Sequence, residues 1–421
     1  MRGRGALVGL ALALLVPAFP AAAQPTPQAG PRWFSAWAAP QNRTETALSL
    51  SDATVRTVVR PTLSGRALRI KLENTLGTSP VTFSGAWVGV PGPGASVVPG
   101  TNLRLMFTGD TALTLEPGAG AWSDPVDVRV VAFQRLVVSL DVAAAEDAST
   151  HTLGLASNHW AWGRRGADPS GEGFEPIPPV AANTSVLAFP VYWVAALDVL
   201  SDSAAGTIVP FGDSITDGRC STTLAGVVRP DLHQRWPDLL AERLAARASG
   251  PDGPLWGLAN AGIAGNRIIV GGNGPPGLER LERDVLERAG VTHVIFFEGT
   301  NDLAGGGATA EEVIEATQRV IERAKARGLK IYGATIIPRG GPDGTTGWSP
   351  DREAHRQAVN AWIRTQAPFD GVLDFAALLG GGPAIEGAES IRPEFNCDYT
   401  HPNAAGYRAM AEMIDLSWFV R

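Results

Sequence analysis

The sequence predicts a chain with two regions of different fold class, an all-β region followed by an α/β region with a parallel sheet. The prediction rests on a change in the period of the apolar residues near residue 204 and on the turn residues that separate short strands before that point. The chain has 421 residues, of which 44% are hydrophobic, so it has apolar material for two or three cores. This composition excludes disorder of the whole chain.

The first residues have the pattern of an export signal. Arg2 and Arg4 are positive, residues 6–19 are mostly apolar, and Ala21–Ala23 are small residues of the kind that a signal peptidase accepts. We therefore expect residues 1–23 to be a cleaved signal peptide and the mature protein to be secreted or periplasmic. An uncleaved anchor is the alternative, but a bilayer span takes about 20 apolar residues, and stable membrane insertion is not expected.

Residues 31–200 are predicted to form a β-sandwich of the jelly-roll type. Leu68, Ile70 and Leu72 alternate with charged residues, which is the period of a strand with one buried face. Turns rich in glycine and proline, such as residues 91–94, separate runs of this kind. Many short strands with such turns are typical of a sandwich or jelly roll.

Residues 204–421 are predicted to form the α/β region, because short apolar runs alternate there with amphipathic stretches. The expected strands are residues 207–211, 294–297, 331–337 and 372–375. The expected helices are residues 237–248, 277–288, 309–327, 351–366 and 403–416. This alternation predicts a parallel sheet covered on both faces, with functional residues at the carboxyl ends of its strands.

Four short motifs lie in the α/β region. The first and the third follow two of these strands, and the second is expected to follow the next strand along the chain after the first motif. They are Phe211-Gly-Asp-Ser-Ile-Thr-Asp-Gly218, Asn260-Ala-Gly-Ile-Ala-Gly-Asn-Arg267, Glu298-Gly-Thr-Asn-Asp302 and Asp398-Tyr-Thr-His-Pro402. A serine on a strand-to-helix turn can present its hydroxyl to solvent, and the flanking glycines permit unusual backbone angles there. Ser214 as a simple helix cap is the structural alternative.

These four blocks, in this order, resemble the SGNH (GDSL) hydrolase family of esterases and lipases over roughly the second half of the chain. The resemblance implies a three-layer α/β/α fold and a nucleophile at Ser214. It implies an oxyanion hole formed by Ser214, Gly265 and Asn301, and a base at His401 supported by Asp398. A β-sandwich beside such a domain resembles the architecture of secreted carbohydrate esterases.

The chemistry also follows from the residue types. A serine hydroxyl becomes a nucleophile when an imidazole accepts its proton, and a carboxylate holds that imidazole in the right tautomer. Hydrogen-bond donors then stabilise the oxyanion that forms on the attacked carbonyl. We expect hydrolysis of short acyl esters, with acetyl groups on carbohydrates among the candidates, through an acyl-serine intermediate. A lipase, arylesterase or thioesterase of the same fold and a non-catalytic carbohydrate-binding protein are the alternatives.

Residues beside the motifs are assigned supporting roles. We expect Asp302 and Asn266 to hold their loops through local hydrogen bonds, and Asp213 and Asp217 to act in the nucleophile turn. The chain has six histidines, and the other five, among them His151 in the β region, lie outside a setting comparable to that of His401.

The two cysteines, Cys220 and Cys397, lie close to the first and the last motif. In an exported protein such a pair predicts one disulfide, here between the nucleophile loop and the acid–base loop. Two buried free thiols are the alternative. Trp160 and Trp162 have two possible roles: they can stack on a sugar or aromatic group, or pack between the two regions.

No cofactor is expected, because no cluster of histidine, cysteine and acidic residues has the spacing of a metal site and no phosphate-binding loop with its lysine is present. The net charge of −7 argues against nucleic acid as a partner. The expected partner is therefore a small-molecule or polysaccharide ester, and the sequence does not predict an oligomeric state.

Overall fold

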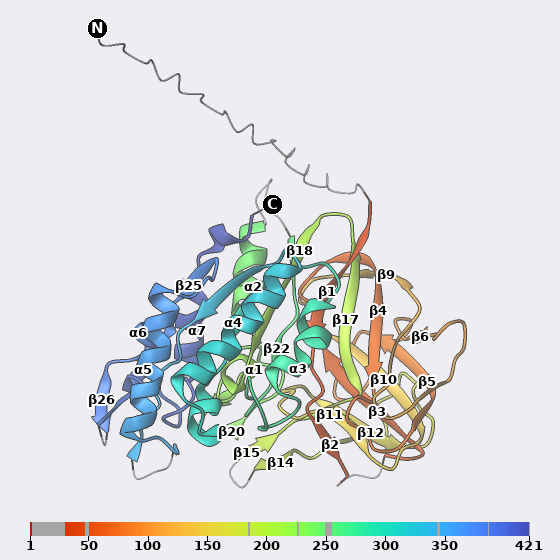
Figure 1. Ribbon diagram of the computed structural model, residues 1–421. Helices are drawn as coiled ribbons and strands as arrows, with labels where there is room; N and C mark the ends of the chain where they lie inside the picture. The colour runs from red at the N-terminus through yellow and green to blue at the C-terminus, as the bar shows by residue number, and fades with distance from the viewer. Residues whose placement is uncertain are drawn as a thin grey trace. The chain divides into compact units, whose positions relative to one another are not determined.

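The computed structural model describes residues 1, 30–46, 50–183, 186–224, 227–248, 255–342, 346–385 and 387–420 (Figure 1). The predicted signal peptide lies outside these residues except for Met1. Pro31–Arg421 form one compact unit, so both predicted regions belong to it. Within the described ranges, no helix has the length and apolar character to cross a membrane.

The first half of the chain is built from antiparallel sheets, as predicted. One sheet has the order β1 (Arg32–Ala38), β17 (Val194–Ser201), β4 (Gly65–Glu73) and β8 (Gly120–Trp122), with β9 (Val126–Val130) also on β4. A second has the order β13 (Glu175–Pro176), β12 (Asn158–Trp162), β3 (Ala53–Val59), β10 (Leu136–Ala144), β5 (Val81–Gly89) and β6 (Leu103–Leu105), with β7 (Leu113–Leu115) also on β5. Smaller antiparallel sheets join β16 (Val191–Tyr192), β11 (Ala148–His151) and β2 (Arg43–Glu45), and β14 (Val180–Asn183) with β15 (Val186–Ala188).

The two larger sheets share one apolar core. The alternation predicted for β4 is present, because Leu68, Ile70 and Leu72 are buried and pack in this core. Phe83 of β5 and Val138 of β10 belong to the same cluster. Side chains of both sheets therefore fill a single interior, which is the packing of a β-sandwich.

The second half of the chain contains the predicted parallel sheet. Its order is β21 (Leu255–Leu258), β18 (Ala204–Gly212), β23 (Val291–Phe297), β24 (Lys330–Ala334) and β25 (Gly371–Leu373), with β22 (Ala261–Gly262) also on β18. Every pairing in it is parallel. Ile208 and Val209 of β18 are successive residues and belong to different apolar clusters, so the sheet is covered on both faces.

Helices supply the two outer layers. On one face, the cluster of Val209 includes residues of α3 (Gly277–Leu281), α4 (Ala310–Ala326) and α5 (Pro350–Thr365). On the other, the cluster of Ile208 includes residues of α2 (Trp236–Ala248), α6 (Phe375–Leu379) and α7 (Ala404–Met413). The three-layer α/β/α class is confirmed.

Four predicted elements are wrong in detail. The strand expected over residues 331–337 ends at Ala334, and the helix expected over residues 403–416 ends at Met413. The helix expected over residues 277–288 is α3 followed by a π-helical turn, η1 (Glu282–Leu286). The strand expected over residues 372–375 ends at Leu373, because the Asp374 carboxylate accepts the N–H of Ala377 and starts α6.

Candidate active site

The first motif forms a sharp turn from β18 into the short helix α1 (Ser214–Asp217). Asp213 caps α1, since its carboxylate accepts the N–H of Ile215 at 2.9 Å, which agrees with the role predicted for it in the turn. A Cβ at Gly212 would lie 2.2 Å from the Thr216 hydroxyl and 2.5 Å from the Phe297 carbonyl, so only glycine fits there. The turn places Ser214 at the carboxyl end of a central strand.

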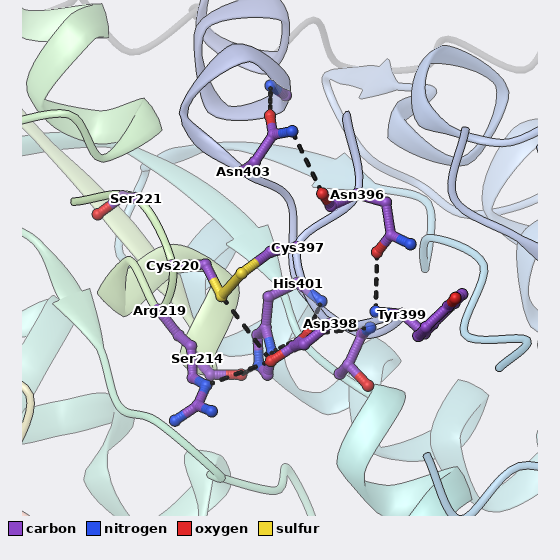
Figure 2. Close-up of a disulfide and its surroundings, with 12 residues drawn as sticks. Ser214, Arg219, Cys220, Ser221, Asn396, Cys397, Asp398, Tyr399, His401 and Asn403 are labelled. Carbon is purple, nitrogen blue, oxygen red and sulfur yellow. Dashed lines mark hydrogen bonds and ion pairs between the residues drawn. A yellow bond between two sulfur atoms is a disulfide. The ribbon is translucent and has the colours of Figure 1, made fainter. Parts of the chain in front are cut away.

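His401 contacts the Ser214 hydroxyl (Figure 2). The distance from Ser214 Oγ to His401 Nε2 is 2.8 Å, and His401 Nδ1 lies 2.9 and 3.0 Å from the two Asp398 oxygens. Because an ionised carboxylate only accepts hydrogen bonds, Nδ1 carries a proton and Nε2 of the neutral ring is free to accept one from Ser214. The N–H groups of Thr400 and His401 also donate to Asp398 and fix its orientation.

The surroundings hold the imidazole in its neutral form. Burial lowers the pKa of His401, and the positive charges of Arg219 and Arg339 lower it further, against the opposing effect of Asp398. The hydrogen bonds and charge of His401 keep the pKa of Asp398 well below its usual range, although burial opposes them. At neutral pH the pair is therefore a carboxylate beside a neutral imidazole, which is the state a general base requires.

Cys220 and Cys397 lie at disulfide-bonding distance, with their Cα atoms 6.4 Å apart (Figure 2). Cys220 follows α1, and Cys397 directly precedes Asp398. The N–H of Cys397 also donates to the His401 carbonyl at 3.1 Å. The bridge thus connects the loop of the serine to the loop of the histidine.

Gly265 and Asn301 lie on neighbouring loops that are joined by a hydrogen bond. Asn301 Nδ2 donates to the Asn266 carbonyl at 3.0 Å, and Arg339 Nη1 donates to Asn301 Oδ1 at 3.3 Å. A guanidinium only donates hydrogen bonds, so the amide oxygen Oδ1 is the atom next to Arg339. The amide N–H₂ therefore remains a donor. Gly265 has φ +77°, a left-handed conformation suited to glycine.

The N–H groups of Ser214 and Gly265 are available to a ligand, because neither donates a hydrogen bond to another residue in the ranges that the structure describes. The second hydrogen of the Asn301 amide is a further donor. The chain thus offers the three donors that the sequence predicts for an oxyanion hole.

Buried polar residues hold these loops, as predicted for Asp302 and Asn266. Asp302 accepts the N–H groups of Ile268 and Ile269 at 3.0 and 3.1 Å. Asn266 donates to the carbonyls of Asn273 and Pro275.

Arg280, whose side chain is fully buried, joins the nucleophile loop to the oxyanion loop. It donates to Asn266 Oδ1 at 2.8 Å and to the carbonyls of Ala261 and Gly212 at 2.7 and 3.0 Å. It also forms an ion pair with Glu298 at 2.8 Å. The carboxyl ends of β18, β22 and β23 are thereby tied to one guanidinium.

Besides Arg280, sequence reasoning missed three residues of this site. Arg219 pairs with Asp398 at 3.5 Å, and Arg339 follows β24 and reaches Asn301. The third is His151, which the prediction set aside. Its Nε2 lies 2.9 Å from Asp217 Oδ1, inside the nucleophile turn. Only the position of Arg339 after a strand was a signal in the sequence.

The two tryptophans of β12, Trp160 and Trp162, differ in their exposure to solvent. Trp160 packs against the core of the β region. The ring of Trp162 meets the Trp160 ring edge-on, with the ring centroids 5.0 Å apart, and Trp162 is 63% exposed.

Among the described residues, the group with metal-ligand spacing is Cys220, Asp398 and His401. Its sulfur belongs to the cysteine bridge, and its imidazole and carboxylate contact each other and Ser214.

Residues 211–409 match the model of the GDSL-like Lipase/Acylhydrolase family. Among solved structures, a GDSL-like lipase from Bacteroides thetaiotaomicron is similar, with 21% identity, 49% of this chain and 85% of that chain covered, and a TM-score of 0.37. A carbohydrate acetylesterase family member from Sinorhizobium meliloti has 17% identity, coverage of 49% and 94%, and a TM-score of 0.38. An acetyl xylan esterase, AlAXEase, has 22% identity, coverage of 49% and 96%, and a TM-score of 0.35. No curated protein matches the chain.

Proposed function

Residues 211–409 belong to the GDSL-like lipase/acylhydrolase family, and on that premise we propose that the chain is a carboxylic ester hydrolase with Ser214 as its nucleophile. One observation carries the proposal: Ser214 Oγ lies 2.8 Å from His401 Nε2, while the other ring nitrogen contacts Asp398. A hydroxyl, a neutral imidazole and a carboxylate hydrogen-bonded in this order allow the imidazole to accept the hydroxyl proton.

The reaction has two steps. Ser214 attacks the ester carbonyl as His401 takes the hydroxyl proton, and the N–H groups of Ser214 and Gly265 and the amide of Asn301 stabilise the oxyanion. The tetrahedral intermediate collapses, and His401 returns its proton to the alcohol, which leaves an acyl-serine. His401 then takes a proton from water, which attacks the acyl group, and returns that proton to the Ser214 oxygen as the ester bond breaks and the acid leaves.

Short acyl groups on polar alcohols are the proposed substrates, with acetyl groups on carbohydrates as candidates. Two guanidinium groups border the site, since Arg219 pairs with Asp398 and Arg339 contacts Asn301. A long alkyl chain laid against them would displace water from charged groups without replacing its hydrogen bonds. An acetyl group avoids this cost, and a sugar can hydrogen-bond to the guanidinium groups instead.

We also propose that the protein is exported. The predicted signal peptide and the pairing of both cysteines favour an oxidising compartment.

The test compares the wild type with Ser214→Ala on p-nitrophenyl acetate, butyrate and decanoate and on acetylated xylan. We expect kcat to fall at least about 10⁴-fold in Ser214→Ala, as for the loss of a nucleophile that acts with its base. Ser221→Ala is the matched control, because its hydroxyl donates to the Gly218 carbonyl and not to His401. A fluorophosphonate should label Ser214 alone, as read by peptide mass spectrometry.

The outcomes separate the alternatives. Preference for decanoate over acetate contradicts the short-acyl proposal and favours a lipase. Equal turnover by the wild type and Ser214→Ala refutes the nucleophile. No turnover by the folded wild type, together with binding of acetylated xylan, favours a carbohydrate-binding protein.

A further inference from the structure

His151 is a buried histidine of the β region that reaches the nucleophile turn. It ends β11 and is only 2% exposed. Its Nδ1 lies 2.8 Å from the Pro40 carbonyl oxygen, and its Nε2 lies 2.9 Å from Asp217 Oδ1, on the last residue of α1. Both ring nitrogens therefore have a partner, and both partners are oxygens.

These contacts determine how many protons the pair holds. A carbonyl oxygen only accepts, so His151 Nδ1 carries a proton. A neutral ring would then turn a bare Nε2 toward a carboxylate, and two acceptors would face each other at hydrogen-bond distance. One more proton is therefore required between Nε2 and Oδ1. An imidazole nitrogen is a stronger base than a carboxylate oxygen, so the proton resides on the ring.

Asp217 also contacts the oxyanion loop. Its second oxygen, Oδ2, accepts the N–H of Ala264 at 2.8 Å, and Ala264 directly precedes Gly265. A Cβ at Gly262 would lie 2.3 Å from the Asp217 N, so β22 packs closely against α1. A buried carboxylate thus joins the helix of the nucleophile to the loop that presents the Gly265 N–H.

We propose that His151 is a positioning residue for ester hydrolysis: as an imidazolium ion paired with Asp217, it holds the peptide of the Ala264 N–H, which directly precedes the peptide that presents the Gly265 N–H to the oxyanion. The kinetic part of this inference rests on the proposed function, whereas the protonation state does not. The carboxylate of Asp217 contacts the ring. The strands on either side of β11 carry Arg43 and Glu45 on β2 and Tyr192 on β16.

The first experiment reads the protonation state of the wild-type protein. Imidazole ¹⁵N shifts are recorded at pH 8, where a histidine with an ordinary pKa is neutral. The chain has only six histidines, and His151→Asn assigns the signal by its loss. We expect both nitrogens of His151 to be protonated in the wild type. In Asp217→Asn, whose amide can donate to Nε2, we expect only Nδ1 to be protonated. A bare nitrogen in the wild type would overturn the inference.

The second experiment uses two amides of matched chemistry. In His151→Gln the amide nitrogen can take the place of Nε2 and donate to Asp217, whereas in His151→Asn it can take the place of Nδ1 and donate only to Pro40. We expect kcat on p-nitrophenyl acetate to fall about 10-fold in His151→Asn, with KM within about twofold, as for a weakened oxyanion donor. We expect His151→Gln to retain at least half of the wild-type kcat.

Each result decides one part of the proposal. Equal kcat in the wild type and His151→Asn would refute positioning, and equal losses in both variants would refute a role for the Asp217 contact. If the wild type itself hydrolyses no ester, the proposed function fails, while the ¹⁵N shifts still test the imidazolium. Thermal unfolding of both variants reveals whether a loss of kcat reflects a misfolded protein.

Discussion

At the residue scale, the charges around His401 determine at which pH the site works. The ring is partly buried beside Asp398, with Arg219 and Arg339 close enough to lower its pKa. Removing a nearby positive charge makes the imidazolium form more favourable and raises this pKa. On acidification, His401 then becomes protonated and stops acting as a general base at a higher pH.

These charges determine the acid limb of the pH–activity profile. We expect kcat/KM on p-nitrophenyl acetate to decline below an apparent pKa lower than the ordinary value of about 6.5 for histidine. Arg219→Gln should move this limb to higher pH, and Arg129→Gln, an exposed arginine on β9, should leave it in place. An unchanged limb in Arg219→Gln would show that the guanidinium does not act on His401.

Asn301 permits a second prediction at this scale. Its amide is held by Arg339 and by the Asn266 carbonyl, so its remaining hydrogen is directed before substrate binds. We expect Asn301→Ala to lower kcat by about 10²- to 10³-fold with little change in KM, because the donor acts on the developing oxyanion. A rise in KM with kcat preserved would instead place Asn301 in ground-state binding.

At the element scale, the sequence predicted the strands well because apolar runs and motifs are local signals. β18 ends at Gly212 and β23 ends at Phe297, so the first and third motifs begin where expected. The contact of His151 with Asp217 joins residues 66 positions apart and leaves no periodic pattern. A buried histidine in a strand has the same sequence pattern whether or not it contacts a carboxylate. The π-helical turn η1 was missed for a similar reason, since it continues the amphipathic pattern of α3.

The bridge between the loops after α1 and before His401 has a predicted effect on stability. Its cysteines are 177 residues apart, and the chain-entropy model gives about 5 kcal/mol as an upper value for a loop of that size. We expect the double variant Cys220→Ser/Cys397→Ser to lose up to about this amount of unfolding free energy in urea titrations. The mass of the unreduced wild type should be two hydrogens below that of the reduced protein. Two free thiols in the wild type would refute the disulfide.

At the scale of the whole molecule, the β and α/β regions share contacts across the predicted boundary near residue 204. The Ser35 N–H donates to the Ala289 carbonyl at 2.9 Å, and Thr207 Oγ1 donates to the Ser35 carbonyl at 3.2 Å. Arg60 forms an ion pair with Glu242 at 2.9 Å. Composition and period predicted two fold classes, but they do not encode these contacts. The division into residues 31–200 and 204–421 therefore stays a prediction about folding units.

These contacts predict that the two regions unfold together. Ser35 lies in β1, the first strand of the β region, yet it hydrogen-bonds to the turn before β23 in the parallel sheet. Loss of the α/β region would leave the buried Ser35 N–H without its partner, and an unpaired buried N–H costs about 1–3 kcal/mol. We expect one calorimetric transition, coincident with the loss of esterase activity and of tryptophan fluorescence.

A substitution in one region tests this coupling. Thr207→Val removes a hydroxyl that donates to the Ala289 carbonyl at 2.8 Å and to the Ser35 carbonyl, and it keeps the shape of the side chain. We expect the whole transition to move to lower temperature by about 1 °C, as a loss of about 1 kcal/mol does in a chain of this size. Two transitions, of which only the one that carries the activity moves, would instead mean that the regions are independent folding units.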